Sequence, residues 1–578
     1  MKKLLIALLF LLVTLAMLHF TGLLGEIRGA LINEFELTSP PALVFYLDES
    51  TVTEDPNSEA LLQLADRQFV TLESLRAADV SAMYYRDAKT LVIQTLEDRI
   101  AITEKQVVVN GSPVDARVEL RSFGDVLYLS AADLNAFDAG KRVGVRVQSF
   151  PEGSMYVTHE RISYPRAAAP IETKLFPTAN WVIASEQTER KLFDFSDKTP
   201  YYGETNGEGY VYEDAEHPGF VRYYGEEGLY GITRSETFPE VKRSEAKIPQ
   251  GKRLDYAKRG PLVLTWEGVY GLNPDTAEIP DMPGLNAISP TWYTIDGTAG
   301  DVSDLAGEEY IAWARSRKYE IWPLLKNEFE DIQATSAFLA SLSAQEKAIR
   351  FLVEESVRHG YDGINVDFEH VYLKDRDALT NFVNMLAFEL RKKNIMISAD
   401  VTVTGGADNW SRCYDHAALG VIVDYLVIMT YDEHYASSPV AGPVASFGWV
   451  KYHMNILKDM VEPQKLVLGL PFYTRLWVET TNPDNPTKVT LKSSAITMLD
   501  QEELLREEQF TVNWDEASGL FFANRYEDNL QYKMWVENAE TIALKLTLVD
   551  EFQLGGVAGW RRDYETPDIW EVIKTLHK

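Results

Sequence analysis

Residues 362–369, with the sequence Asp-Gly-Ile-Asn-Val-Asp-Phe-Glu, constrain the fold of this chain more than any other segment. Successive side chains of a strand point to opposite faces, so Asn365, Asp367 and Glu369 share one face while the residues between them are apolar. A helical pattern of apolar residues over 346–359 comes directly before this run. The segment therefore predicts a helix, a turn and a buried strand with one polar face.

The two acids of this strand suggest acid–base chemistry. Residues two apart on a strand lie about 7 Å from each other along the backbone, close enough for one carboxylate to raise the pKa of the other. Glu369 alone is explained equally well as the solvated end of a strand. Three polar residues alternating on a buried strand need another reason, because buried polar groups are costly.

Strand patterns alternate with helical patterns along the last 320 residues, a number obtained as 578 − 258. The strand candidates are 262–266, 287–292, 320–325, 363–369, 395–401, 425–430, 466–470 and 556–560. Eight strands alternating with helices predict an α/β fold, a TIM (β/α)8 barrel over 259–578. The long gap before the last strand predicts an α+β insertion between strands 7 and 8, over about 478–537.

Four motifs carry a resemblance to a known family. Asp362, Asn365, Asp367 and Glu369 follow, in order, the acidic pattern at the end of the fourth strand in glycoside hydrolase family 18. Segments 429–432, 469–475 and 559–560 resemble its motifs on strands six, seven and eight. Within that family the chain looks most like the bacterial spore-cortex and cell-wall N-acetylglucosaminidases.

The resemblance implies the catalytic roles. Glu369 would protonate the leaving glycosidic oxygen and later activate water. The nucleophile would be the substrate's own 2-acetamido oxygen, with Asp367 orienting the acetamido N–H and stabilising the oxazolinium ion. Tyr431 would donate its hydroxyl to the acetamido oxygen. This mechanism demands an N-acetylated sugar at the −1 subsite.

Further residues are expected to bind the substrate. Trp560 would form the floor beneath the −1 sugar, because an indole face offers a large apolar contact to pyranose C–H groups. The other candidates for sugar contact are Asn365, Asp432, Tyr473, Arg475 and Asn327. Alternative interpretations remain open, since Tyr431 and Trp560 can be aromatic residues of the barrel core and Arg475 a structural ion-pair residue.

The chain departs from the family pattern at two places. Asn365 stands where the family most often has Asp, and because Asn cannot ionise, Asp367 is expected to stay anionic more easily. The Ser- and Gly-rich motif of the third strand is replaced by Trp-Pro-Leu-Leu-Lys-Asn at 322–327. Asn327 is then a candidate for a structural or sugar-binding role.

Neither a metal nor a cofactor is expected. Asp432, Glu433 and His434 superficially resemble a metal cluster, but no second histidine lies at ligand spacing. Cys413 is the only cysteine, which excludes an internal disulfide framework and a cysteine zinc cluster. A lone cysteine is more often a small buried hydrophobic residue than a catalytic thiol.

The charge of the chain excludes one class of partner. Its 87 acidic and 56 basic residues give a formal net charge of −31, which opposes binding to nucleic acid and to anionic lipid surfaces. With 46% hydrophobic and 11% aromatic residues the chain is globular, and 578 residues predict several domains.

The N-terminus predicts export. Two lysines precede a mostly apolar run over 4–24, long enough to cross a bilayer and without a clear cleavage site after it. Residues 1–27 are therefore expected to be a membrane anchor or, if cleaved, a secretion signal. The enzyme body would lie outside the cytoplasm, anchored to the membrane by the N-terminal helix or secreted.

Two small modules are expected between this segment and the barrel. Residues 40–165 resemble the small N-terminal α+β module first named from copper amine oxidases, with a hairpin signal at Asn110-Gly111. That resemblance concerns the fold only, because no histidine cluster here can bind copper. Residues 171–250 carry aromatic β-patches and glycine turns typical of a small β-barrel similar to bacterial SH3 modules.

Three functions are compatible with these observations. The leading one is an exported glycoside hydrolase that cleaves β-1,4 bonds after N-acetylglucosamine, most plausibly in peptidoglycan of the cell wall or spore cortex. The polymer can instead be chitin or a chito-oligosaccharide. The third is a sugar-binding or scaffold protein without catalysis, against which the presence of Glu369 argues.

Overall fold

The computed structural model describes two parts of the chain in most detail. These are residues 67–138 apart from 78–80 and 124–125, and residues 256–577 apart from 483–484, with short stretches, nearly all strands, elsewhere before residue 256. The chain divides into two compact units, residues 1–83 with 91–250 and residues 84–90 with 251–578.

Among its described residues, the first unit contains β-sheets whose strand pairs are antiparallel except for β2 and β14, and the short helices α3 (Leu72–Ala77) and α4 (Ala131–Asp138). Its strands are β1 (Leu37–Thr38), β2 (Phe45–Leu47), β3 (Ser50–Thr53), β4 (Leu61–Leu64), β5 (Arg67–Thr71), β6 (Ala82–Tyr85), β7 (Thr90–Gln94), β8 (Arg99–Ile102), β9 (Val107–Val109), β10 (Ser112–Val114), β11 (Leu120–Phe123), β12 (Val126–Ser130), β13 (Val145–Ser149), β14 (Met155–His159), β15 (Arg166–Ala167), β16 (Trp181–Ile183), β17 (Phe193–Phe195), β18 (Gly209–Glu213), β19 (Phe220–Gly225) and β20 (Tyr230–Arg234).

The hairpin turn expected at Asn110-Gly111 is present in this unit. β9 and β10 form a hairpin whose turn is Asn110-Gly111, and both turn residues have positive φ, at 51° and 81°. The resemblance of residues 40–165 and residues 171–250 to known modules stays a prediction. The expected anchor or signal at 1–27 lies outside the described residues. Within the described part of the chain, no helix is both long and apolar enough to cross a membrane.

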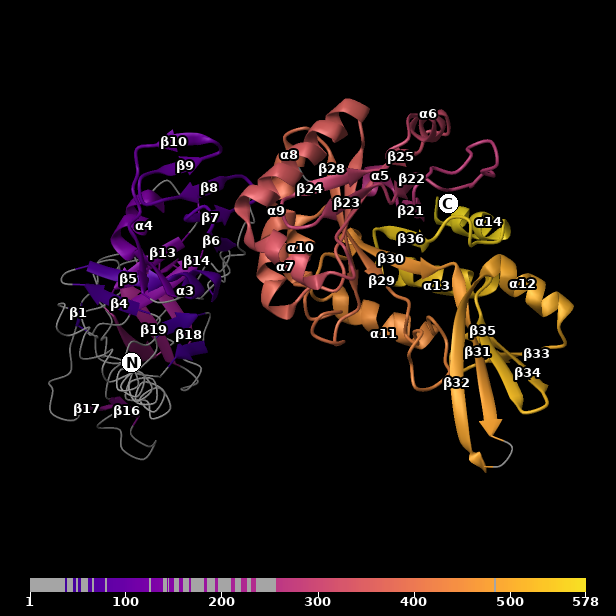
Figure 1. Cartoon of the computed structure of the whole chain (residues 1–578). Helices are drawn as coiled ribbons and strands as arrows, with labels where there is room; N and C mark the ends of the chain where they lie inside the picture. Colours follow the sequence, from indigo (N-terminus) through magenta and orange to yellow (C-terminus); the bar gives the residue numbers. More distant parts are fainter. Residues whose placement is uncertain are drawn as a thin grey trace, which may run out of the picture. The chain divides into compact units, whose positions relative to one another are not determined.

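The second unit is built on eight parallel strands (Figure 1). In chain order they are β21 (Leu262–Glu267), β22 (Ala287–Pro290), β25 (Glu320–Ile321) continued by β26 (Leu324–Lys326), β27 (Gly363–Asp367), β28 (Met396–Thr402), β29 (Tyr425–Met429), β30 (Leu466–Pro471) and β36 (Gly556–Trp560). Neighbours in sequence pair in parallel, and β36 pairs with β21. The α/β barrel predicted from the sequence is therefore confirmed.

The third strand is interrupted, which the sequence pattern did not predict. β25 pairs with β22 and β26 pairs with β27, while Trp322 and Pro323 lie between the two pieces. The Trp322 N–H donates to the carbonyl of Ile288, and the Asn365 N–H donates to the carbonyl of Pro323. Proline has no N–H to give to a ladder, which explains a break at this point. The backbone bonds nevertheless close the barrel across it.

Helices connect these strands, and a further hairpin, β23 (Tyr293–Asp296) and β24 (Asp301–Asp304), follows β22. The helices of the second unit are α5 (Tyr256–Arg259), α6 (Glu308–Ser316), α7 (Ile332–Ala340), α8 (Leu342–His359), α9 (Arg376–Arg391), α10 (His416–Ile422), α11 (Phe447–Leu457), α13 (Ala539–Phe552) and α14 (Asp568–Ile573), with short 3-10 turns at Leu373–Asp375, Pro463–Lys465 and Lys574–His577. Helix α8 ends at Gly360, whose φ of 66° is the left-handed cap conformation.

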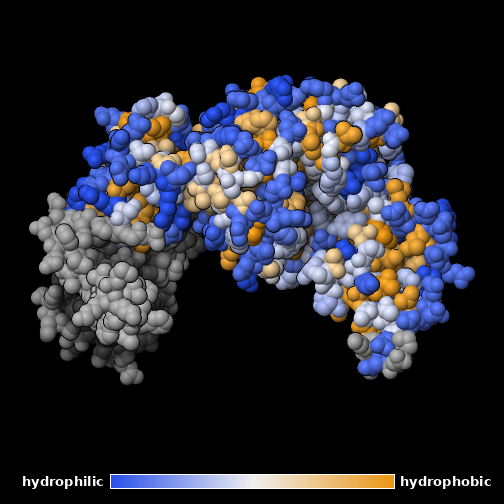
Figure 2. All heavy atoms as spheres, in the orientation of Figure 1, coloured by the Kyte–Doolittle hydropathy of each residue, from blue (hydrophilic) through white to orange (hydrophobic). Residues whose placement is uncertain are grey.

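An insertion lies between β30 and β36 and projects from the barrel (Figure 1). It comprises β31 (Tyr473–Asn482), β32 (Asn485–Thr497), α12 (Met498–Glu507), β33 (Thr511–Asp515), β34 (Leu520–Glu527) and β35 (Leu530–Val536). The strands form an antiparallel sheet in the order β32-β31-β35-β34-β33. Figure 2 shows hydrophobic residues gathered on this insertion, where Val512 and Trp514 of β33 are exposed.

Candidate active site

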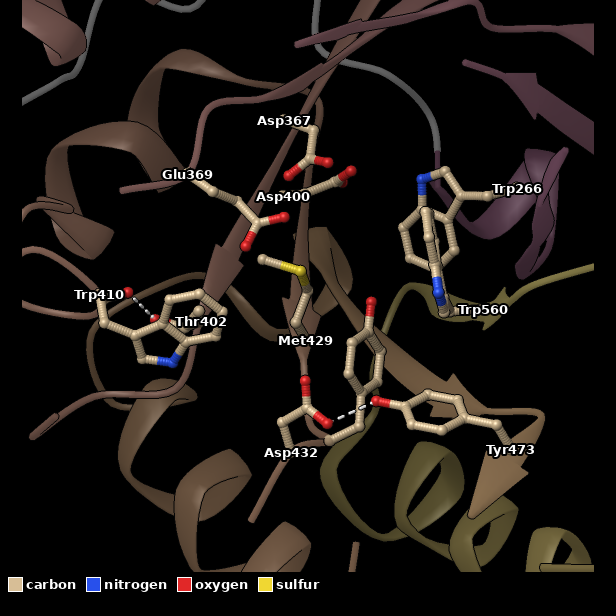
Figure 3. Close-up of a pocket in the computed structure, with 11 residues that line it drawn as sticks. Trp266, Asp367, Glu369, Asp400, Thr402, Trp410, Met429, Asp432, Tyr473 and Trp560 are labelled. Carbon is tan, nitrogen blue, oxygen red and sulfur yellow. Dashed lines mark hydrogen bonds between the residues drawn. The ribbon is translucent and has the colours of Figure 1, made fainter. Parts of the chain in front are cut away.

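A pocket of about 570 Å³, partly open to solvent, lies among the carboxyl ends of the barrel strands. Its lining consists of Trp266, Asp367, Glu369, Asp400, Thr402, Trp410, Met429, Tyr431, Asp432, Tyr473 and Trp560. Figure 3 shows the carboxyl groups of Asp367, Glu369 and Asp400 gathered on one side, facing Trp266 and Trp560. We call Asp367, Glu369, Asp400 and Asp432 the pocket carboxyls. Parallel strands end at one edge, which is why residues from separate segments meet here.

Glu369 is positioned through its backbone. It follows β27, and its N–H donates to Oδ1 of Asn327 at 2.9 Å, while Nδ2 of Asn327 donates to the Glu369 carbonyl at 2.9 Å. Asn327 is 1% exposed and does not line the pocket, so its predicted sugar contact is replaced by a positioning role. Burial raises the pKa of Glu369 to about 7, with Asp432 adding to the rise and Lys326 opposing it.

Asp367 lies deeper than Glu369, at 4% exposure, and its Oδ1 has no hydrogen-bond partner among the described residues. Its pKa is raised well above the usual range by burial and by the charges of Glu369 and Asp400, whereas Lys326 lowers it. The pKa of Asp367 is therefore raised although position 365 holds no acid, and the expectation that Asn365 makes its ionisation easier stays a prediction. Asp400 supplies the neighbouring charge instead.

Asp400 was missed in the sequence. It lies on β28, is 2% exposed, and accepts a hydrogen bond of 2.7 Å from Nδ2 of Asn365. Burial raises its pKa to about 8, although the hydrogen bonds from Asn365 and Trp266 act in the opposite direction. Ser398, Asp400 and Thr402 alternate along this strand as the polar residues of β27 do, and that alternation was the available signal.

Asn365 does not line the pocket, which corrects its predicted contact with substrate. Its Oδ1 accepts from Nε1 of Trp266 at 2.9 Å and from Oγ of Ser289 at 3.1 Å, and its Nδ2 donates to Ser398 Oγ at 2.9 Å and to Asp400. All the hydrogen-bonding capacity of this amide is used. We call Ser289, Asn365 and Ser398 the inner polar layer.

The sixth strand brings Tyr431 and Asp432 to the pocket. Asp432 adopts a left-handed backbone conformation with φ of 61°, and its Oδ1 accepts a 2.7 Å hydrogen bond from the hydroxyl of Tyr473. Burial raises the pKa of Asp432, while Tyr473 and Arg475 lower it. Burial also raises the pKa of Tyr431 well above its usual range, so this hydroxyl stays a proton donor.

Arg475 does not line the pocket either, and its predicted contact with sugar is not seen. Its Nε donates to Oγ of Ser493 at 3.1 Å, and its guanidinium lies 5.9 Å from the ring of Trp477. The charge of Arg475 acts on Asp432, whose ionised form it favours. Arg475 is therefore a structural residue that tunes one pocket carboxyl.

Aromatic side chains form the walls of the pocket. Trp560, predicted as the floor of the sugar site, lies with its ring centroid 5.5 Å from that of Trp266. Trp266 and Trp410 were not identified from the sequence, because a tryptophan at the end of a hydrophobic strand or in a loop gives no local signal of its position. Together they offer flat apolar surfaces to a pyranose ring.

The triplet Asp432-Glu433-His434 does not converge on one point. Asp432 accepts from Tyr473, Glu433 accepts from the N–H of Ser446, and His434 contacts the carbonyl of Pro443. Among the described residues no group of three or more histidine, cysteine or acidic side chains is arranged to hold a metal ion.

The chain matches the family model described as "Glycosyl hydrolases family 18" over residues 330–565, a span that contains β27, β28, β29, β30 and β36. Trp266, on the first strand, lies outside the matched span. All four pocket carboxyls fall within it.

Curated relatives match part of the chain. The uncharacterized glycosylase YvbX of Bacillus subtilis (strain 168) is 25% identical over 300 residues, which is 50% of this chain and 84% of the relative. The cortical fragment-lytic enzyme of Bacillus anthracis is 26% identical over 242 residues, 41% of this chain and 55% of the relative. A chitinase structure from Chromobacterium violaceum ATCC 12472 has a TM-score of 0.48 and 25% identity, covering 55% of this chain and 99% of that one.

Proposed function

The barrel of this chain belongs to the glycosyl hydrolases of family 18, and on that premise we propose that it cleaves β-1,4 bonds after N-acetylglucosamine in peptidoglycan, with the substrate's acetamido group as nucleophile. The observation that carries this proposal is the placement in one pocket of Asp367, at the end of β27, and Glu369, two residues further along the chain. Glu369 has a pKa of about 7, suited to giving up a proton near neutral pH. Burial and the charges of Glu369 and Asp400 raise the pKa of Asp367 well above its usual range, which disfavours its ionised, nucleophilic form.

This arrangement favours attack by the substrate itself. A retaining glycosidase that uses a carboxylate nucleophile needs that carboxylate ionised beside the anomeric carbon. Asp367 is buried next to two other acids, which disfavours its ionised form in the empty pocket. A positive oxazolinium ion would reverse this preference, so Asp367 would release its proton to solvent as that cation forms, and the resulting carboxylate would stabilise the cation.

The remaining pocket residues have clear tasks in this scheme. The carboxyl of Glu369 protonates the leaving oxygen and then takes a proton from the attacking water. The hydroxyl of Tyr431 donates to the acetamido oxygen, and Trp560 and Trp266 support the apolar face of the −1 sugar. The hydroxyl of Tyr473 donates a hydrogen bond to Asp432, which holds the Asp432 side chain in place next to Tyr431.

The polymer is proposed from the relatives together with the N-terminal sequence. One relative is named for lysis of cortical fragments, which are peptidoglycan. An apolar run after two lysines at the N-terminus supports a location outside the cytoplasm, tethered to the membrane by that segment or secreted, where wall polymer is found.

Digestion of purified peptidoglycan by the full chain tests the proposal. Mass spectrometry of the new reducing ends should identify N-acetylglucosamine. N-acetylmuramic acid at those ends would contradict it, and cleavage of chitin without any cleavage of peptidoglycan would redirect it to a chitinase. Glu369→Gln, digested in parallel, separates enzymatic cleavage from background lysis.

A further inference from the structure

Among the described residues, no lysine or arginine lines the pocket to receive an acidic substrate, although the charges of Lys326 and Arg475 act on its carboxyls. Its described lining holds four carboxylic acids and neither lysine nor arginine. Peptidoglycan is an anionic polymer, because its muramyl sugars carry either a free lactyl carboxylate or a stem peptide with acidic residues. The pocket lining offers such a carboxylate no cationic partner, so a cation at the rim would have to compensate for this lack.

Arg561 is placed to provide that compensation. It follows Trp560, which lines the pocket, and its guanidinium lies over Gly268, two residues after the pocket-lining Trp266. A Cβ added to Gly268 would collide with Nη1 of Arg561, so the guanidinium occupies the space that this glycine leaves. Arg561 is therefore next to Trp560 in the chain and packs against the segment that follows Trp266.

Two tyrosines hold this guanidinium. Its carbon lies 5.4 Å from the ring centroid of Tyr270 and 4.3 Å from that of Tyr564, and Nη2 donates to the Tyr564 hydroxyl at 3.2 Å. Tyr270 is 78% exposed, which places this cluster at the surface. Aromatic faces fix a guanidinium without neutralising it, so its donors remain available to an anion.

Arg562, the next residue in the chain, is a structural arginine and serves as a comparison for Arg561. Arg562 is 9% exposed and makes a bidentate ion pair with the buried Glu267. Arg561 forms no ion pair with any residue that the structure describes, and its Nε is buried without a hydrogen-bond partner there.

We propose that Arg561, held between Tyr270 and Tyr564, is a specificity residue that binds a carboxylate carried by a muramyl sugar next to the cleaved bond. The inference rests on the proposed function and deepens it by naming the group that distinguishes peptidoglycan from neutral chitin. A planar guanidinium suits this task, since it binds a carboxylate through two parallel hydrogen bonds.

The test compares hydrolysis by the full chain of four substrates. They are a neutral chito-oligosaccharide, glycan strands with stem peptides, strands from which an amidase has freed the lactyl carboxylates, and those freed strands after coupling to a neutral amine. The measured quantity is kcat/KM on each of the three glycan-strand substrates divided by kcat/KM on the neutral oligosaccharide.

We expect Arg561→Gln to lower this ratio about tenfold, the loss of a charge-assisted hydrogen bond. Arg561→Lys, which keeps the charge but not the fork, should lower it less. Gly268→Ala should lower it as Arg561→Gln does, because the added methyl group displaces the guanidinium. Arg506→Gln, at an exposed position on α12 whose partners are surface glutamates, is the matched control and should leave the ratio unchanged.

The outcomes separate the two proposals. If Arg561→Gln lowers the ratio on amidase-treated strands relative to the wild type, and has no such effect after amine coupling, the bound group is the lactyl carboxylate. If it lowers the ratio only on peptide-bearing strands, the bound group is the stem peptide. A ratio unaffected by Arg561→Gln, or wild-type cleavage of the neutral oligosaccharide alone, would overturn the role of Arg561 while leaving a glycosidase. Wild-type cleavage of none of the four would overturn the proposed function itself.

Discussion

The barrel contains two sets of buried polar groups that differ in how completely they are hydrogen-bonded. The inner polar layer is saturated, since the amide of Asn365 makes four hydrogen bonds. The pocket carboxyls follow further along the strands. Asp367 there has an oxygen without a hydrogen-bond partner among the described residues, and Asp367, Glu369 and Asp400 all have raised pKa values. The inner polar layer therefore stabilises the fold, while the pocket carboxyls keep hydrogen-bonding capacity with which they can bind the substrate.

The largest effect should come from the acid at the pocket. In Glu369→Gln the amide cannot transfer a proton, so we expect kcat/KM on a chito-oligosaccharide to fall about a thousandfold. An aryl glycoside, whose leaving group needs little protonation, should lose much less. The midpoint of thermal unfolding should not fall. Full activity of this variant on the oligosaccharide would remove Glu369 from the chemistry.

Asp367→Asn should reduce kcat about a hundredfold, the scale of one electrostatic contact to a charged intermediate. Its thermal stability at pH 8 should be equal to that of the wild type or higher, because the carboxyl is buried, burial disfavours its ionised form, and its Oδ1 accepts no hydrogen bond among the described residues. A clear loss of stability would instead place Asp367 with the inner polar layer. Calorimetry of both proteins at pH 8 measures this.

Asn365→Ala should have the opposite profile. Removing the amide leaves several buried groups unpaired, and we expect the free energy of unfolding to fall by about 2 kcal/mol, with a smaller loss of activity transmitted through Asp400. Ser398→Ala, which removes one of these bonds, is the matched control and should cost less. Denaturant unfolding of the two variants compares them, and an unchanged midpoint for Asn365→Ala would show that the layer is dispensable.

The pH dependence follows from the raised pKa values. Glu369 must be protonated to act, so kcat/KM should fall about tenfold per pH unit above about 7. For stability, acids with pKa values raised on folding bind more protons in the folded state, so the free energy of unfolding should decrease as pH rises from about 5 to about 8. Glu369→Gln should show a weaker decrease, and a rise in stability over this range would contradict the assignment.

The smallest effect is expected at the sixth strand. Tyr473→Phe removes the hydrogen bond to Asp432, which raises the pKa of that acid further and loosens its side chain. A fall in kcat/KM of about fivefold is expected, close to the value of one neutral hydrogen bond. A loss comparable to that of Glu369→Gln would make Tyr473 part of the chemistry.

The order of the barrel strands and the identity of the acids on β27 could be predicted because both depend on local pattern. Alternation marked Asp367 and Glu369, and runs of apolar residues marked the strands. Pro323, which interrupts the third strand, was visible in the sequence but was treated as part of a continuous strand. The local signals were sufficient for the fold of the barrel, though not for its details.

The partners of the site residues could not be predicted in the same way. Asn327 acts on the backbone of Glu369 across 42 positions, and Asn365 bonds to three other strands. These bonds depend on how the closed barrel aligns its strands, which no local pattern records. For that reason Asn327, Asn365 and Arg475 were expected to contact substrate, and Asp400 and Trp266 were missed.

The most direct test of substrate-assisted catalysis changes the nucleophile in the substrate and leaves the protein intact. Two fluorogenic chitobiosides, one with the N-acetyl group on the sugar at the cleaved bond and one with N-trifluoroacetyl there, are hydrolysed by the wild-type chain. Fluorine withdraws electrons from the amide oxygen, so we expect kcat to fall at least about tenfold on the second substrate. Equal rates would mean that the amide oxygen does not attack, and the assignment of roles to Glu369 and Asp367 would have to be withdrawn.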